Sequence, residues 1–199
     1  MASHGPKCRQ CRREGTKLYL KGTRCETEKC AVVKRPQAPG QHGTKYGKVS
    51  SYGTQLREKQ KAKRTYGVLE TQFKNYIDTA FKKHGITGEI LLQALESRFD
   101  NMVYRSGFAT SRAQARQYIR SGFFTINGKN NNIPSTKIKL GDEIRPVDIS
   151  RIQLRQGFTL PEWLSANVAQ KFVKFERMPV LEDLEGSINV QLIVEYYSR

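Results

Sequence analysis

Four cysteines within the first thirty residues have the type and spacing of a metal site. They form two pairs, Cys8-x2-Cys11 and Cys25-x4-Cys30, with thirteen residues between the pairs. Thiolates are soft ligands, and two such pairs can converge on one tetrahedral zinc ion. Four protein ligands leave no open position for a substrate, so the pattern predicts one structural Zn²⁺ ion. An iron–sulfur cluster uses the same ligands and stays an alternative, as do free thiols.

The surroundings of the cysteines favour reduced thiols over disulfides. The residues before Cys8 are polar and include no apolar secretory segment, so nothing indicates export to an oxidising compartment. Five cations crowd the cysteines, and their field is expected to lower the pKa of the thiols. These cations are Lys7, Arg9, Arg12, Arg13 and Lys29.

The positive charge of the 199-residue chain is concentrated in its N-terminal third. Residues 1–64 contain 17 Lys and Arg and 4 Asp and Glu, a net charge of +13, and the whole chain carries +17. An excess of this size favours a polyanionic partner, nucleic acid above all. No apolar run is long enough to span a bilayer, and the basic stretches lack a large apolar face, so a membrane partner is disfavoured. A solvated basic tail without a specific partner is the alternative.

A second set of residues suited to chemistry lies on a short helix predicted after Ser111. Ser111 and Gln114 form a capping-box start. Three arginines then follow four residues apart, namely Arg112, Arg116 and Arg120. This spacing places the guanidiniums in one ridge, and we expect no acid to relieve their repulsion. The ridge is therefore interpreted as a clamp for phosphate oxygens, joined by Arg105, with a merely solvated helix face as the alternative.

A loop and three helices are predicted between these two sets. Prolines and glycines from Arg35 to Gly43 exclude a helix or a central strand. Residues 55–64 favour a helix so rich in cations that little of it can be buried. Apolar residues at three- to four-residue spacing predict a helix with a core face over 69–81, and another from residue 88 to just before Gly107.

Short strands are predicted after the arginine ridge. Residues 124–126 alternate into Asn127-Gly128, a strong signal for a two-residue hairpin turn. Residues 138–140 indicate a further strand, and the apolar residues around Pro146 suit an edge strand. Another strand is predicted over 171–178.

Several motifs occur in a fixed order along the chain. They are Ala38-Pro39-Gly40-Gln41-His42-Gly43, Tyr52-Gly53, Gln55-Leu56-Arg57-Glu58-Lys59-Gln60-Lys61, Tyr66-Gly67-Val68, the block from Leu95 to Phe108, Ser111-Arg112-Ala113-Gln114-Ala115-Arg116-Gln117, Ile126-Asn127-Gly128-Lys129, and the ending from Leu192 to Arg199. This set resembles the bacterial family of small-subunit ribosomal protein four, which contains the αL RNA-binding motif. The resemblance covers essentially the whole chain.

The resemblance implies an α+β fold in which an αL RNA-binding domain of short helices and a small antiparallel sheet is inserted into a mostly helical domain. The implied boundaries are 1–44 for a basic metal-binding arm, 45–92 with 182–199 for the helical domain, and 93–181 for the inserted domain. Periodicity fits residues 188–196 equally to a helix or a strand. The resemblance implies a helix there that packs on the helices near residues 55–85.

The resemblance also implies a function without catalysis. The family consists of cytoplasmic ribosomal proteins that bind the 5′ domain of small-subunit ribosomal RNA early in assembly, contact ribosomal small-subunit protein five, and lie at the messenger RNA entry channel. The candidate rRNA-binding residues are Arg9, Arg12, Arg13, Arg35, His42, Arg57, Lys61, Arg64, Arg105, Ser111, Arg112, Arg116, Arg120 and Lys129. Lys45 and Lys48 are the candidate contacts to incoming mRNA.

Two other function classes fit the residues less well. An enzyme is disfavoured because the chain has no phosphate-cradling glycine loop and no nucleophile motif. The acid pairs Asp142-Glu143 and Glu182-Asp183 are interpreted as turn and helix-start residues. A DNA-binding zinc regulator would need a recognition helix, which the loop between the cysteine pairs lacks. His42 could be a metal ligand, but four cysteines suffice, so an RNA contact is preferred.

Overall fold

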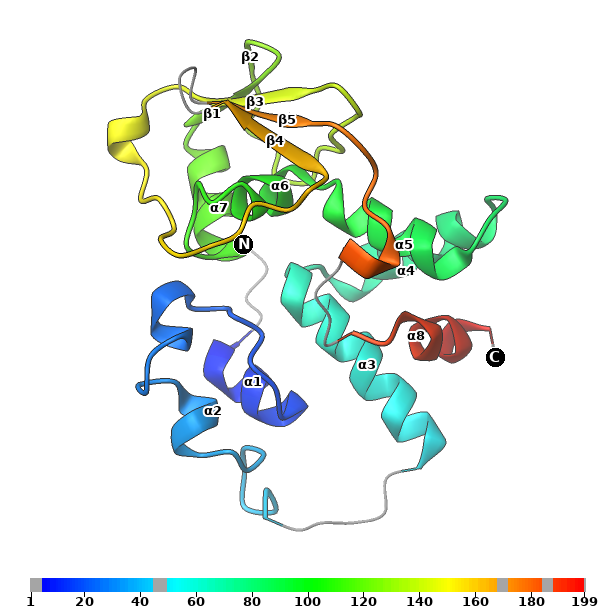
Figure 1. Ribbon diagram of the computed structural model, residues 1–199. Helices are drawn as coiled ribbons and strands as arrows, with labels where there is room; N and C mark the ends of the chain where they lie inside the picture. The colour runs from blue at the N-terminus through cyan, green and yellow to red at the C-terminus, as the bar shows by residue number, and fades with distance from the viewer. Residues whose placement is uncertain (1–4, 45–49, 168–171, 184–187, 199) are drawn as a thin grey trace. The chain divides into compact units, whose positions relative to one another are not determined.

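The computed structural model describes residues 5–44, 50–167, 172–183 and 188–198. The chain forms two compact units, Met1–Leu91 with Gly186–Arg199 and Leu92–Glu185 (Figure 1). The predicted α+β class is confirmed, because helices and a small antiparallel sheet are both present. The boundary at residue 44, which would make the arm a separate domain, stays a prediction. None of the described helices is long and apolar enough to cross a membrane.

The N-terminal segment of the first unit contains three short helices. Helix α1 spans Lys7–Glu14 and ends at Gly15, whose left-handed φ of 68° stops the helix. The 3₁₀ helix η1 spans Gly22–Cys25, and α2 spans Ala31–Lys34. Each therefore contains or directly follows a cysteine.

Helix α3 spans Ser51–Tyr66 and carries the cation-rich stretch. Ser50 caps its start by accepting from the backbone N–H of Gly53. The prediction that little of the helix over 55–64 is buried was wrong, because four residues of that stretch are buried: Gln55, Lys59, Lys61 and Ala62. Burial of the two lysines is possible because carboxylates receive their ammonium groups, Glu70 for Lys59 at 2.5 Å and Glu58 for Lys61 at 3.1 Å.

Three further helices complete the first unit, although α5 continues into the second. Helix α4 spans Glu70–Phe81, α5 spans Thr87–Glu96 and α8 spans Val190–Tyr197. The core face predicted over 69–81 is confirmed at its three central apolar residues, Phe73, Ile77 and Ala80, while Leu69 and Phe81 at its ends are exposed.

The C-terminal segment is a helix that packs on α3, as the resemblance implied. Asn189 caps α8, and its backbone N–H donates to the carboxylate of Glu58. The ammonium of Lys59 lies 4.8 Å from the ring centroid of Tyr196, and the amide of Gln55 donates to Glu195. A cation–π contact and hydrogen bonds thus hold α8 against α3.

The second unit begins with a helix break that the sequence did not predict. One helix was expected from residue 88 to Gly107, but α5 ends at Glu96 and α6 spans Phe99–Arg105. The backbone of the break pairs with residues 136–138, since Ile138 N–H donates to Ser97 O and Phe99 N–H donates to Thr136 O. These hydrogen bonds replace helical ones, so the chain turns at this point. Helix α7, Arg112–Arg120, follows.

A five-stranded antiparallel sheet forms the rest of the second unit. Its strands are β1 Phe124–Ile126, β2 Lys129–Asn130, β3 Glu143–Pro146, β4 Leu164–Asn167 and β5 Phe172–Phe175, in the order β2-β1-β3-β5-β4. The predicted edge strand at Pro146 is central, because β3 lies between β1 and β5. Pro146 is tolerated there because it lies beyond Glu143 and Ile144, the two residues of β3 that pair with β5. The described chain has no ladder strand over 138–140, and the preceding residue, Lys137, makes only an isolated bridge with Arg98.

Helices α6 and α7 lie against one face of this sheet (Figure 1). The core between them combines aliphatic and aromatic residues: Phe124 from β1 packs edge-on against Phe99 of α6 and also contacts Phe108. Trp163 packs edge-on against Phe175 of β5. Two 3₁₀ turns, η2 Ile149–Arg151 and η3 Leu181–Asp183, lie outside the sheet strands. The packed core fixes the position of α7 and therefore of the arginine ridge.

Candidate nucleic-acid interface

The predicted capping box of α7 is present, but the side chain of Gln114 bonds to the residue before the cap and not to the cap residue itself. Ser111 Oγ accepts from the backbone N–H of Gln114 at 3.3 Å. The amide oxygen of Gln114 accepts from the backbone N–H of Thr110 at 2.8 Å, so the reciprocal bond goes to the residue before the cap. Ala115 and Ile119 are fully buried, which fixes the rotation of the helix. Arg112 and Arg116 are consequently half-buried beside α6, and Arg120 is exposed.

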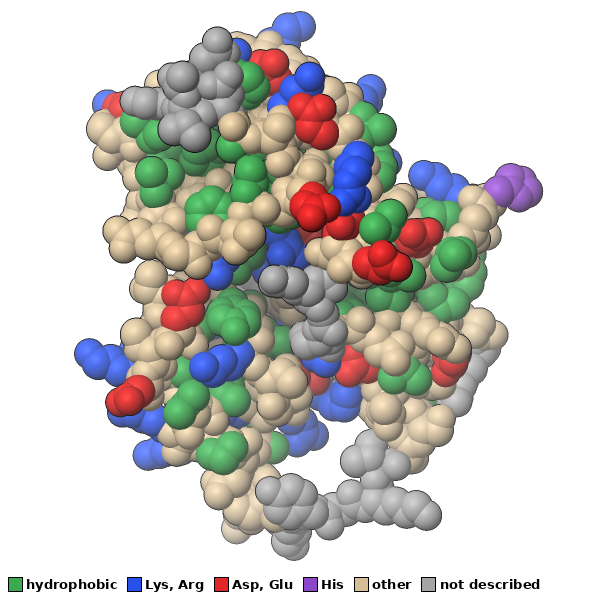
Figure 2. Space-filling view, viewed as in Figure 1, with side chains coloured by type: hydrophobic (Ala, Val, Ile, Leu, Met, Phe, Trp, Pro, Cys, Tyr) green, Lys and Arg blue, Asp and Glu red, His purple; other side chains and the backbone are tan. Residues whose placement is uncertain are grey.

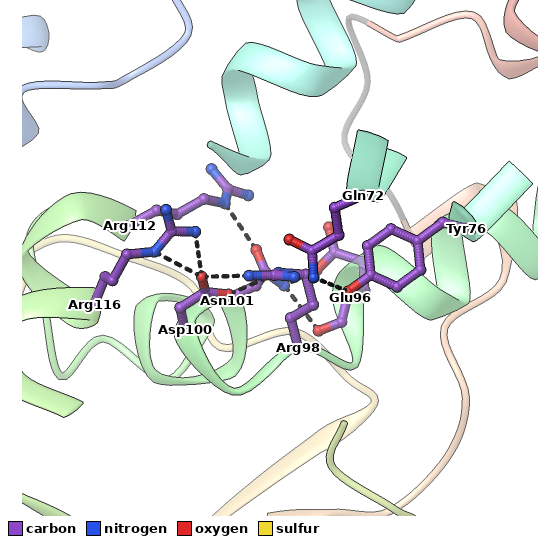
Figure 3. A network of polar contacts seen from close by, with 8 residues as sticks. All are labelled: Gln72, Tyr76, Glu96, Arg98, Asp100, Asn101, Arg112 and Arg116. Atoms are coloured by element: carbon purple, nitrogen blue, oxygen red, sulfur yellow. Dashed lines mark hydrogen bonds and ion pairs between the residues drawn. The ribbon is translucent and has the colours of Figure 1, made fainter. Parts of the chain in front are cut away.

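An acid from α6 neutralises the middle of the arginine ridge. Asp100 is 2% exposed, and its Oδ2 accepts from Nε of Arg116 at 3.1 Å (Figure 3). Arg98 donates to the same carboxylate through Nε at 3.1 Å and Nη2 at 2.9 Å. The prediction that no acid relieves the ridge was wrong, because the acid comes from another helix and not from α7 itself. A buried carboxylate with two guanidiniums leaves one net positive charge in place.

A second buried carboxylate holds the neighbouring arginine. Glu96 is fully buried, and its carboxylate receives Nε and Nη2 of Arg105 at 3.1 and 2.9 Å. Asn101 donates to the same carboxylate at 2.6 Å, and its own amide oxygen accepts from Nε of Arg112 at 2.8 Å. Figure 3 shows Arg112 and Arg116 pointing toward Asn101 and Asp100. The guanidiniums are therefore held in fixed positions before any ligand arrives.

The sequence itself carries a signal for these two buried acids. Glu96 and Asp100 are charged residues within the apolar stretch that was predicted as one helix. Charged residues are almost never fully buried unless they are paired. An acid inside an apolar stretch, followed by a run of arginines, could have predicted the pairing.

Two candidate arginines of α3 are held by the N-terminal segment. Glu14, at the end of α1, has a side chain only 1% exposed, and its Oε1 receives Nη1 of both Arg57 and Arg64. Burial raises the pKa of Glu14, and the two arginines offset part of that effect. Lys61, also a candidate, is 8% exposed and donates to Glu58. All three candidate RNA-binding residues of α3 thus already form ion pairs within the first unit.

The remaining described candidates are presented to solvent. Arg9, Arg13, Arg35, His42 and Lys129 are exposed. Arg12 is half-buried, and its Nε donates to the backbone oxygen of Gln37 at 3.0 Å. Lys and Arg side chains gather over the segment of α1 and α2 on the face in Figure 2. Lys45 and Lys48 lie outside the described residues.

The cysteines are buried thiols in the N-terminal segment. Cys11, Cys25 and Cys30 are buried and Cys8 is partly buried. Burial raises the pKa of Cys11 and of Cys25, so the expectation that the surrounding cations lower these pKa values was wrong. The charges of neighbouring cysteines raise both pKa values further. Within the described part of the chain, however, no group of three or more His, Cys, Asp or Glu is arranged to hold a metal ion. The donor set fits zinc by type and burial, but the side chains are not drawn together around a central position.

Comparisons with known proteins match both units. The model of the ribosomal protein S4/S9 N-terminal domain matches residues 2–96, and the model of the S4 domain matches residues 97–144. A small ribosomal subunit protein uS4 from Natranaerobius thermophilus is 52% identical over 98% of each chain. Proteins of the same name from Thermodesulfovibrio yellowstonii and Thermus thermophilus are 50% and 49% identical, again over 98% of each chain.

Matches of this identity and coverage establish the family. The resemblance stated from the sequence is thereby confirmed, and so is the expectation that the protein is not an enzyme. The chain belongs to the uS4 family of ribosomal proteins, which are structural constituents of the small ribosomal subunit.

Proposed function

We propose that this protein binds the 5′ domain of small-subunit ribosomal RNA directly and helps to nucleate the assembly of that domain. As a uS4 family member it is a structural constituent of the small subunit, and ribosomal RNA and other ribosomal proteins are its partners there. The observation that carries the proposal is the ridge on α7, where Arg112 and Arg116 are held in place by Asn101 and Asp100.

The geometry of the ridge suits the backbone of folded RNA. The deep, narrow major groove of A-form RNA does not admit side chains, so proteins recognise such RNA through its shape, phosphates and 2′-hydroxyls. Guanidiniums fixed by buried partners lose little conformational entropy when they bind phosphate oxygens. A rigid set of arginines therefore selects RNA whose phosphates match their spacing.

Filter binding across a salt series tests the proposal. The purified protein is titrated with 5′-domain RNA and, as a control, with an unrelated structured RNA of equal length. We expect tight binding to the 5′ domain to persist at salt concentrations that abolish binding to the control. Equal and equally salt-sensitive binding to both RNAs would reduce the protein to a generic basic RNA binder and contradict the proposal.

Two finer roles rest on the family alone. We further propose that the protein lies at the messenger RNA entry channel, with Lys45 and Lys48 as contacts to mRNA, and that it contacts ribosomal small-subunit protein five and contributes to translational accuracy. Crosslinking of mRNA to the assembled subunit tests the first role, with Lys45→Gln/Lys48→Gln as the variant. Crosslinks to this protein that are unchanged in the variant would remove the two lysines from the channel.

A structural metal ion in the N-terminal segment is the last part of the proposal. Cys8, Cys11, Cys25 and Cys30 would hold one Zn²⁺, with an iron–sulfur cluster as the alternative. Residue type and burial of the thiols support this, and a bound ion would draw the four sulfurs together and crosslink α1, η1 and α2. The ion would stabilise the segment that carries Arg9, Arg12 and Arg13 and take no part in RNA recognition.

A further inference from the structure

The turn between β1 and β2 is a dipeptide whose two residues can react with each other. Asn127 and Gly128 are exposed, and their φ values of 50° and 77° lie in the left-handed region. In an Asn-Gly sequence the backbone nitrogen of the glycine can attack the side-chain carbonyl carbon of the asparagine, because glycine has no Cβ to hinder the approach. Among the described atoms, none lies within 4 Å of the place that a Cβ of Gly128 would occupy. The nucleophile is therefore sterically accessible.

The side chain of Asn127 is bonded to the residues at the start of β3. Its amide nitrogen donates to Oδ1 of Asp142 at 2.8 Å, and its amide oxygen accepts from the backbone N–H of Glu143 at 2.9 Å. The other oxygen of Asp142 accepts from the backbone N–H of Lys139 at 2.8 Å, which fixes this carboxylate. An amide held at both its nitrogen and its oxygen must break these bonds before it can turn toward Gly128. The fold therefore slows a reaction that the dipeptide favours.

The same bonds tie the turn to the sheet. The backbone N–H of Asn127 also donates to the backbone oxygen of Glu143 at 2.9 Å, so three hydrogen bonds join this residue to the start of β3. A carboxylate in place of the side-chain amide would face the carboxylate of Asp142 without a proton between them. Like charges at hydrogen-bond distance repel each other. Conversion of Asn127 to an acid would thus replace an attractive contact by a repulsive one.

We propose that Asn127 is a site of spontaneous deamidation and that its bonds to Asp142 and Glu143 set the rate. The backbone nitrogen of Gly128 forms a bond to the side-chain carbonyl carbon of Asn127 and gives up its proton, while the bond from that carbon to the amide nitrogen breaks and ammonia leaves. Water then adds to one of the two carbonyls of the cyclic imide and opens the ring to aspartate or isoaspartate. The net reaction consumes one water and releases one ammonia, so it needs no enzyme and no oxidant.

Peptide mapping by mass spectrometry tests the site in the unaltered, full-length protein. During incubation in mildly alkaline buffer, Asn127 should be converted faster than the nearby asparagines that no glycine follows, Asn130, Asn131 and Asn132. Unfolding in urea should accelerate conversion of Asn127 by at least about tenfold, since one hydrogen bond to a charged group is enough for that factor. Asn127 that is no faster than its neighbours, or equally fast in the folded and the unfolded protein, overturns the proposal.

Asp142→Ala tests the bond that restrains the side chain. The variant should accelerate conversion of Asn127 in the folded protein by about tenfold, because the amide is released more often. Asp148→Ala is the matched control, since it removes an exposed acid of the same unit that accepts from Ser150. Circular dichroism checks that both variants are folded. Equal conversion rates in the two variants would show that Asp142 does not protect Asn127.

Asn127→Asp reproduces the aspartate product and tests the consequence for the sheet. The substitution should lower the midpoint of urea unfolding when Asp142 is present, because two carboxylates then face each other. It should leave the midpoint nearly unchanged in an Asp142→Ala background, where the repulsion is absent. Equal shifts in the two backgrounds would contradict the proposed repulsion.

Discussion

Arg116 donates two hydrogen bonds to Asp100, from Nε at 3.1 Å and from Nη2 at 2.5 Å, although the two residues belong to different helices. The same carboxylate also receives Arg98, so one buried acid positions two arginines. The buried position of Asp100 in the second unit therefore determines where these two arginines lie.

Replacing this acid should cost both stability and RNA affinity. Asp100→Asn leaves the guanidiniums of Arg98 and Arg116 without their counter-charge in a buried site. We expect a loss of about 3 kcal/mol in the free energy of unfolding, measured by urea denaturation. Glu143→Gln is the control, because the Arg145–Glu143 pair is far more exposed than Asp100 and should contribute about 0.5 kcal/mol. Equal effects of the two substitutions would contradict a structural role for Asp100.

The ridge on α7 should set the salt dependence of RNA binding. Arg112→Ala/Arg116→Ala removes two guanidiniums, and we expect the logarithmic salt slope for 5′-domain RNA to fall by about one to two. Filter binding measures the slope, and circular dichroism checks that α7 is retained. An unchanged slope in a folded variant would exclude both arginines from the interface.

Acid should loosen the pairing of α3 with α4. Burial alone would raise the pKa of Glu70, but hydrogen bonds from Lys59 and Lys63 outweigh it and lower the pKa to about 2. A depressed carboxyl pKa contributes stability that is present above the ordinary value of 4.5 and is lost as the pH falls from there toward 2. Glu70 is about half-exposed, so solvent screening limits the contribution to about 1 kcal/mol.

Glu70→Gln isolates this contribution. The variant should unfold more readily than the unaltered protein at pH 7, and the difference in the free energy of unfolding should shrink by pH 3. Asp78→Asn, an exposed position on the same helix, serves as the control. A difference that does not depend on pH would show that the ionised carboxylate is not what stabilises the pairing.

The N-terminal segment should detach when its buried acid is removed. Glu14→Ala leaves Arg57 and Arg64 without their shared partner and should weaken docking of α1 on α3 by at least about 1.4 kcal/mol. Limited proteolysis should then cleave within residues 5–44 about tenfold faster, since cleavage tracks the population of the open form. Glu26→Ala, at an exposed position of the same segment, should leave the cleavage rate unchanged.

Metal analysis decides the role of the cysteines. We expect about one equivalent of zinc in untagged protein, lost in Cys25→Ser and retained in the exposed neighbour variant Thr27→Ala. Chelation should accelerate cleavage of the N-terminal segment. A coloured preparation with iron would favour the cluster, and a colourless, metal-free and folded preparation would exclude both.

Local sequence signals predicted the features that depend on near neighbours. Ser111 and Gln114 predicted the start of α7, and Asn127-Gly128 predicted the β1–β2 turn, where the two residues have φ values of 50° and 77°. Such φ values are the requirement of a tight hairpin turn, and these residue types meet it with little strain. The family could also be predicted from the sequence, because each of its motifs is a short run of neighbouring residues.

Features that depend on distant partners were not predictable in this way. The α5–α6 break at Ser97 exists because residues 136–138 compete for its backbone hydrogen bonds. Lys59 is buried because α4 and α8 supply a carboxylate and an aromatic ring. The strand that ends at Pro146, β3, is central and not an edge strand because β5 pairs with its far side. In each case the deciding residue lies too far along the chain for a periodicity window to include it.

The docking of α8 on α3 has a consequence for the order of folding during synthesis. Residues that join these helices lie 131 to 144 positions apart, as in Asn189 with Glu58 and Tyr52 with Tyr196. Helix α3 therefore leaves the synthesising ribosome long before its partner exists, and the aromatic cover of Lys59 arrives last. The second unit has its whole core within residues 99–175 and can close first. The second unit therefore does not depend on α8 for its closure, whereas the first unit is completed only when α8 has been released.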